Sequence, residues 1–192
     1  MRRLLLRLED ARPLDRIAGV LGRAAGATVA RGSMGPALHG SWFGHPLHPA
    51  VVQFPVGAWL SAAVLDALPE RDDPAIRRAT TVLLGAGTVA ALPAIATGGS
   101  DFTTLTARQR RVAVVHAAAN VVAVKLFAVS VLARMGGAHR AGRLLSLAGL
   151  GLAGASAYLG GHLAYAQGAG VEAALPPVPV PVPAPEPAAA RR

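Results

Sequence analysis

Cysteine is absent from this chain of 192 residues. Its absence excludes disulfides, thiolate metal sites, iron–sulfur ligation and cysteine nucleophiles. Charged residues are scarce at 15%, whereas a soluble globular protein usually carries about 25%. Aromatic residues make up only 4%, and they do not interleave with the arginines as stacking platforms for nucleic acid would. The chain therefore lacks the polar surface that it would need in water, and its net charge of +9 does not indicate a nucleic-acid partner.

Long apolar runs take the place of the missing charge, because 53% of the residues are hydrophobic. A helix needs about 20 mostly apolar residues to cross a bilayer. Four stretches meet this requirement, at residues 50–68, 80–97, 112–133 and 144–165. Each must be helical, since backbone groups left unpaired in lipid are costly. Buried helices of a soluble all-α domain are the alternative, and the shortage of charge argues against it. The sequence predicts an all-α fold, a four-helix transmembrane bundle over residues 38–171 in a lipid bilayer.

The two ends of the chain differ from this apolar middle. Residues 1–37 are basic, and apolar residues such as Ile17, Val20 and Leu21 recur in them at helical spacing. This pattern predicts an amphipathic N-terminal helix, which either lies on anionic headgroups or caps the bundle. Residues 172–192 are rich in alternating prolines, which favour polyproline II or disorder and predict a disordered C-terminal tail.

Four spans place both termini on one side of the membrane. That side carries twelve arginines against six in the two opposite loops, although the excess disappears when only residues close to the spans are counted. Arginine also outnumbers lysine eighteen to one, a bias typical of GC-rich bacterial genomes. We therefore expect a multi-pass protein of the bacterial cytoplasmic (inner) membrane with both termini in the cytoplasm.

Four of the six histidines are predicted to share one layer, at the membrane face where the termini lie. His45 and His48 directly precede the first span. His116 follows the start of the third span by about 6 Å of helix, and His162 lies three residues before the end of the fourth. Asp101 follows the second span and emerges at the same face. The topology thus predicts four imidazoles and one carboxylate at a common depth.

Ionisable groups at the edge of a membrane need partners. Imidazole finds one by ligating a metal or haem iron through one ring nitrogen while the other donates a hydrogen bond. The first hypothesis is accordingly a small electron-transfer or haem-binding protein, in which two of His48, His116 and His162 are axial ligands of haem b. The second is a divalent-metal site made by His45, His48, Asp101, His116 and His162.

A third hypothesis needs no ligand. His116 and His162 would then form hydrogen bonds across helices, to Asn120, to Ser156 or to a backbone carbonyl. The protein would in that case be a non-catalytic structural or assembly subunit of a membrane redox complex.

Other polar residues are expected to lie apart from the histidine layer. His39 and His139 are predicted to be solvated loop residues. Lys125 is the only lysine and lies in mid-span, where it is predicted to reach toward the membrane surface or to pair with Asp66. Asp66 and Asp101 fall on opposite sides of the membrane and cannot act as an acid–base pair, so an enzyme is not expected.

Several short motifs resemble a known family. They are Leu38-His39-Gly40, the run Gly44-His45-Pro46-Leu47-His48-Pro49, Pro55-Val56-Gly57-Ala58-Trp59, and Gly160-Gly161-His162-Leu163. Together they are similar to an uncharacterised bacterial membrane family, domain of unknown function 2231, over about residues 3–171. The resemblance implies a four-span integral membrane protein. Some relatives look linked to a Rieske iron–sulfur domain, which implies a redox setting; since this chain has no cysteine, such a partner would be a separate iron–sulfur protein.

Overall fold

The computed structural model describes residues 2–170, and all regular secondary structure in that range is helical. The predicted all-α fold is confirmed. The proline-rich tail predicted at residues 172–192 lies outside the described residues. In chain order the elements are α1 (Arg2–Glu9), α2 (Leu14–Ala27), α3 (Met34–His39), α4 (His48–Val51), α5 (Gln53–Ala67), α6 (Pro74–Thr104), α7 (Ala107–Met135), α8 (His139–Gly161) and the π-helical turn η1 (His162–Ala166).

Four helical segments of the described chain are long and apolar enough to cross a membrane. They cover His48–Ala67, Pro74–Thr104, Ala107–Met135 and His139–Ala166. The last three have 31, 29 and 28 residues, and a helix of that length measures about 42–47 Å. This matches the thickness of a bilayer with its headgroup layers, about 40–45 Å. The helices therefore extend beyond the apolar stretches seen in the sequence and into the polar interface on both sides.

Capping residues explain where two of these helices begin. The Asp73 carboxylate accepts hydrogen bonds from the backbone N–H groups of Ala75 and Ile76 at the start of α6. At the start of α7, Thr106 and Gln109 exchange side-chain and backbone hydrogen bonds in a capping box. Both devices satisfy the free N–H groups of a first helical turn, so each helix starts in the polar loop before its apolar stretch.

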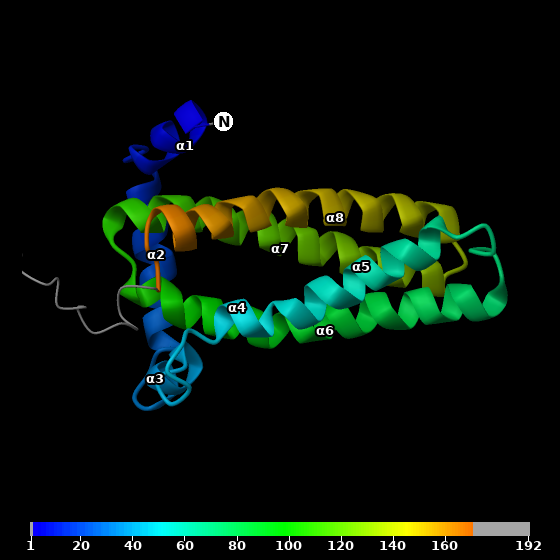
Figure 1. Ribbon diagram of the computed structural model, residues 1–192, viewed down its shortest axis with the longest axis horizontal. Helices are drawn as coiled ribbons and strands as arrows, with labels where there is room; N and C mark the ends of the chain where they lie inside the picture. Colours follow the sequence, from blue (N-terminus) through cyan, green and yellow to red (C-terminus); the bar gives the residue numbers. More distant parts are fainter. Residues whose placement is uncertain (1, 171–192) are drawn as a thin grey trace, which may run out of the picture.

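The bundle consists of two helical hairpins, α5–α6 and α7–α8, lying side by side (Figure 1). At its centre the Trp59 and Phe127 rings stack, with centroids 4.1 Å apart. Glycines make room for both rings. A Cβ atom at Gly87 would lie 2.7 Å from the Trp59 ring, and one at Gly149 would lie 3.2 Å from the Phe127 ring. Small residues opposite large rings thus allow the helices to pack closely in lipid.

The N-terminal helix α2 lies across one end of this bundle (Figure 1). Its Ala18 is buried in a cluster with Phe102 of α6, Val112 of α7 and Leu163 of η1. Ile17 and Val20 on its other side are exposed. The predicted amphipathic N-terminal helix is therefore present, and it packs on the end of the bundle.

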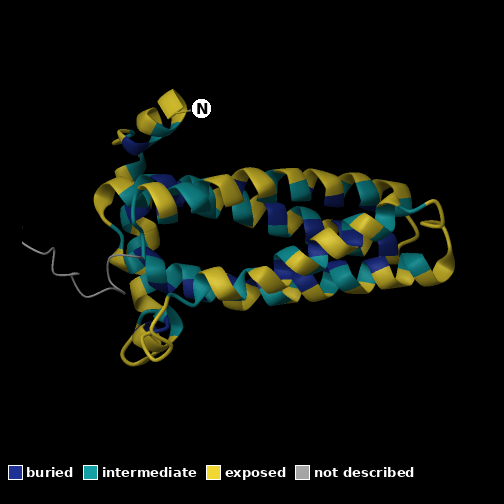
Figure 2. Ribbon diagram, viewed as in Figure 1, coloured by how far each residue is buried: buried dark blue, intermediate teal, exposed yellow. Residues whose placement is uncertain are grey.

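The outer surface of the bundle is largely apolar, and Figure 2 shows exposed residues along the full length of its helices. Large hydrophobic side chains among them include Val89 and Leu92 of α6, Leu132 of α7 and Leu147 of α8. Apolar side chains so widely exposed are typical of a surface that faces lipid. Composition, helix length and surface agree that this is an integral membrane protein.

Candidate functional site

His48 lies in the first turn of α4, at the end of the bundle that α2 covers. Its Nδ1–H donates a 2.9 Å hydrogen bond to the carbonyl of Ala94 in α6. The ring rests against Gly98, where a Cβ atom would come within 3.0 Å of it. No hydrogen bond to Nε2 of His48 occurs within residues 2–170, so the lone pair of that nitrogen has no protein donor.

His116 of α7 has the same arrangement against a different helix. Its Nδ1–H donates a 2.8 Å hydrogen bond to the carbonyl of Ser156 in α8. Its ring rests on Gly160, where a Cβ atom would lie 3.1 Å away. The side-chain amide of Asn120 donates to Nε2 over 3.1 Å. Both contacts fit a neutral imidazole with its proton on Nδ1.

These two imidazoles meet in the bundle. Their ring centroids are 6.4 Å apart and their planes are nearly perpendicular, at 87°. All four membrane segments contribute, because α4 and α7 carry the rings while α6 and α8 supply the carbonyls and the glycines. The predicted convergence of histidines from separate spans therefore holds for His48 and His116.

His162 has a different partner from the one that the common layer predicted. Its Nε2 lies 2.7 Å from a carboxylate oxygen of Glu9 at the end of α1. Glu9 is buried, and the Nε of Arg108 lies 2.9 Å from its other oxygen. Burial raises the pKa of Glu9, but the hydrogen bond from His162 and the charge of Arg108 outweigh it, so the pKa is lowered overall. His162 thus fastens the last span to the N-terminal segment.

Asp101 and His45 also lie outside the histidine pair and contact other residues. Asp101 lies 2.7 Å from Nδ1 of His39, and both side chains are 22% exposed. The prediction that His39 is a solvated loop residue is wrong, because this contact holds it against α6. His45 is exposed, and its ring lies edge-on to Phe43 at 6.4 Å.

The five residues predicted as a joint metal set are therefore not gathered at one point. Within residues 2–170 there is no group of three or more His, Asp or Glu side chains that could hold a metal ion. What the structure assembles is a pair of imidazoles whose Nδ1 atoms donate to backbone carbonyls. Within the described residues Nε2 of His48 has no hydrogen-bond partner, and Nε2 of His116 accepts from the Asn120 amide.

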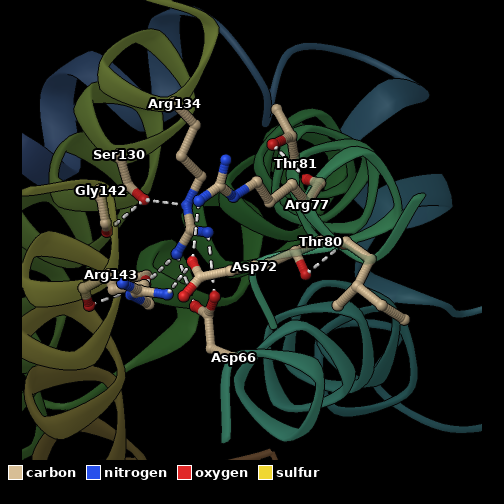
Figure 3. A network of polar contacts seen from close by, with 11 residues as sticks. Asp66, Asp72, Arg77, Thr80, Thr81, Ser130, Arg134, Gly142 and Arg143 are labelled. Carbon is tan, nitrogen blue, oxygen red and sulfur yellow. Dashed lines mark hydrogen bonds and ion pairs between the residues drawn. The ribbon is translucent and has the colours of Figure 1, made fainter. Parts of the chain in front are cut away.

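The opposite end of the bundle contains a buried ion pair that the sequence reasoning missed. Figure 3 shows Arg134 of α7 reaching Asp66 at the end of α5. The two N–O distances are 3.0 and 2.5 Å, and the Arg134 side chain is only 2% exposed. The hydroxyls of Ser130 and Ser146 accept further hydrogen bonds from the guanidinium. Lys125, which was predicted to reach the membrane surface or to pair with Asp66, has an exposed side chain and does not make this contact.

Close packing explains why Arg134 is held so firmly. A Cβ atom at Gly142 of α8 would lie 2.6 Å from the Arg134 side chain. Nearby, Asp72 of the α5–α6 loop binds both Arg77 and Arg143, at 2.9 and 3.2 Å. Hydrogen bonds from these two arginines lower the pKa of Asp72. This end therefore joins all four spans through charge.

Comparison with known proteins gives one match. Residues 44–173 match a protein family described as "Predicted membrane protein (DUF2231)". Neither the curated proteins nor the solved structures contain a match to this chain.

Proposed function

Because the chain belongs to the DUF2231 family of predicted membrane proteins, we propose a function that rests on the histidine pair of its membrane domain. The protein is a small electron-transfer protein that holds haem b, with His48 and His116 as the axial ligands. Haem iron supplies one-electron chemistry when it is bound. The chain's own residues set the position of the ligand nitrogens, their protonation and their access to water.

The separation of the two rings carries this proposal. Two imidazoles on opposite sides of one metal ion, each bonded at about 2 Å through a ring nitrogen, have ring centres about 6 Å apart. The His48 and His116 centroids are separated by 6.4 Å. The separation of the two rings is therefore close to the one that ligation through both would require.

The hydrogen bonds of the pair support ligation through Nε2. Histidines that ligate metals almost always donate their other ring N–H to a carbonyl, a carboxylate or water, which fixes the tautomer and the orientation of the ring. Both Nδ1 atoms do so here, to Ala94 and Ser156. Ligation through His116 additionally requires the amide of Asn120 to release Nε2.

The number of ligands favours haem over a bare divalent ion. A structural zinc site uses four protein ligands and a catalytic one three, and residues 2–170 contain no group of three suitable side chains. Haem iron already has four nitrogens from its macrocycle and needs only the two axial positions. A pair of histidines therefore matches the requirement of haem.

A second candidate function has its own supporting observation. Both ring nitrogens of His116 already have hydrogen-bond partners inside the protein. The pair can thus serve as a lock between helices in a non-catalytic subunit, as the third sequence hypothesis states.

An optical spectrum and a metal analysis of the purified protein separate these functions. The haem proposal expects a Soret band in protein from haem-replete cells, lost in His48→Ala and in His116→Ala. His162→Ala and His45→Ala are matched controls that keep the band, because those imidazoles lie outside the pair. Metal without porphyrin would support the divalent-ion hypothesis, and protein without either would leave only the structural function.

The proposal also assigns a location and a partner. The chain lies in the bacterial cytoplasmic membrane with its N-terminal segment in the cytoplasm, and it exchanges electrons with a separate iron–sulfur protein at that face. The position of the pair supports this, since His116 follows the start of α7 by only about 14 Å of helix. Fusion of alkaline phosphatase to the N-terminus tests the orientation. Phosphatase activity in intact cells would place the N-terminus outside the cytoplasm and would contradict the proposed orientation.

A further inference from the structure

A hollow lies at the end of the bundle opposite the histidine pair. Its volume is about 380 Å³, and it opens between the start of α6, the end of α7 and the start of α8. The polar side chains that line it include Arg77, Arg78, Arg134 and His139. Figure 3 shows Arg77 and Arg134 on neighbouring helices at this end.

Two nitrogens in the lining of this hollow are shielded from water but have no hydrogen-bond partner within residues 2–170. They are Nε of Arg77 and Nδ1 of His139. Buried polar atoms are almost always satisfied in folded proteins, so two orphans around one hollow require a cause. Because both nitrogens are shielded in the present rotamers, a ligand that accepts hydrogen bonds would reach them only after the Arg77 or His139 side chain turns toward the hollow.

The charge of the lining is positive. Three arginines line the hollow and no carboxylate does. Asp66 and Asp72 bind Arg134 and Arg77, whereas Arg78 has no ion pair among the described residues. In addition, α8 begins at His139 without a side-chain cap, so the positive end of that helix lies at the lining, whereas Asp73 already caps the start of α6. An anion is the ligand that this field favours.

The rim of the hollow is apolar and faces outward. Val82 of α6 is 60% exposed and Met135 of α7 is 73% exposed, and both belong to the lining. Met135 is the last residue of α7, and Val82 lies about two turns into α6. The hollow thus places cationic side chains beside apolar ones, which suits a ligand with an anionic head and an apolar tail.

We propose that this hollow binds the phosphate headgroup of an anionic phospholipid from the leaflet opposite the N-terminal segment. Arg78, which is exposed and has no ion pair among the described residues, contacts the phosphate; Arg77 and His139 reach it by turning their side chains, and Val82 and Met135 support the first acyl carbons. This site is independent of the histidine pair and of any haem there.

Native mass spectrometry of the detergent-solubilised chain, titrated with phosphatidylglycerol or phosphatidylcholine, tests the site. The wild type is expected to retain phosphatidylglycerol in preference to phosphatidylcholine. Arg78→Gln is expected to weaken phosphatidylglycerol binding about tenfold or more, the effect of losing one hydrogen bond to a charged group, whereas general attraction to an anionic surface accounts for only about fivefold. His139→Gln is expected to weaken it further in the double variant.

Arg140→Gln is the matched control, because Arg140 is exposed beside His139, carries the same charge as Arg78 and does not line the hollow. Equal losses in Arg78→Gln and Arg140→Gln would show only general attraction to the surface and would overturn the site. Equal retention of the two lipids would overturn it as well. Displacement of phosphatidylglycerol by an equal concentration of inorganic phosphate would assign the hollow to free phosphate and reject the lipid.

Discussion

Each end of the bundle holds polar side chains between its helices, and the two ends supply hydrogen-bond partners for them in different ways. At one end, His48 and His116 place ring N–H groups on backbone carbonyls of α6 and α8. At the other, Arg134 places its guanidinium on Asp66 and two serine hydroxyls. Nε2 of His48 has no hydrogen-bond donor within residues 2–170, and Nε2 of His116 accepts only from the Asn120 amide, whereas the Arg134 guanidinium is engaged by Asp66 and two serines. The nitrogen atoms that could ligate iron therefore lie at the histidine end, whereas Arg134 and Asp66 are committed to one another.

The largest expected effect comes from breaking the ion pair. Arg134→Met leaves Asp66 charged and without its partner in the bundle, and loss of one member of a buried pair costs about 3–5 kcal/mol. Chemical unfolding in detergent measures this loss. Combining Arg134→Met with Asp66→Leu is expected to recover most of it, because no charge is then stranded.

Lys125→Met is the control for that experiment. It makes the same kind of change on the same helix, but Lys125 is exposed in mid-span, so its replacement by Met is expected to leave the free energy of unfolding unchanged or to raise it, because a lysine at the centre of a span costs about 2.5–3.5 kcal/mol. If Lys125→Met destabilised the protein as much as Arg134→Met does, the loss would come from removing a cation anywhere on α7.

The next effect tests the packing of the histidine pair. Gly160→Ala places a methyl group 3.1 Å from the His116 ring, and overpacking of this kind costs about 1–3 kcal/mol. The displaced ring is also expected to weaken haem retention, seen as a smaller Soret band per protein. Gly154→Ala on the same helix meets nothing within 4 Å, so it should leave both readouts unchanged. A similar loss in Gly154→Ala would mean that α8 is sensitive to any added methyl group.

Lowering the pH is expected to detach the N-terminal segment before the bundle itself unfolds. The pKa of Glu9 is lowered from its ordinary value of 4.5 in the folded chain. Its contribution to stability is therefore complete above that value and is lost as the pH falls through the lower, folded-state pKa. The hydrogen bond from Arg111 lowers the pKa of Asp15 in α2 as well, so both carboxylates act in the same direction.

Hydrogen exchange of α1 and α7 against pH measures this release. Protection of α1 is expected to fall below about pH 4.5 while protection of α7 persists. Glu9→Gln should weaken the protection of α1 at neutral pH and reduce its dependence on pH. Loss of α1 and α7 protection at the same pH would contradict a separate release.

The smallest effect concerns Asn120. Because its amide donates to Nε2 of His116, Asn120→Leu removes a competitor for the ligand nitrogen. Haem affinity is expected to rise by a few fold, in line with one hydrogen bond of about 1 kcal/mol. A haem titration of the apoprotein checks this. An affinity that falls instead would mean that Asn120 holds the ring in place for ligation.

Most of the fold could be predicted from the sequence, because a membrane span is a local property of about 20 residues. The approach of His48 to His116 also followed from local positions and topology. The partners of the other buried polar residues did not. His162 meets Glu9, 153 residues away, and Arg134 meets Asp66, 68 residues away. Neither pair leaves a periodic signal, and both depend on how helices rotate about their axes once they are packed.

The N-terminal segment illustrates this point most clearly. The sequence analysis assigned Glu9 no role, but its carboxylate contacts both His162 and Arg108. His39 was expected in water and lies on Asp101 instead. In both cases an amphipathic segment that packs on the end of the bundle supplied a partner that no span could provide.

The link from Glu9 to His162 also has a consequence for synthesis. The first helix of the described chain has its partners in α7 and at the end of α8, which leave the ribosome after it. During translation the contact of Glu9 with His162 therefore cannot form until the final transmembrane helix has been inserted. Closing that end of the bundle therefore follows insertion of the spans, although the residues of α1 that close it are made before them.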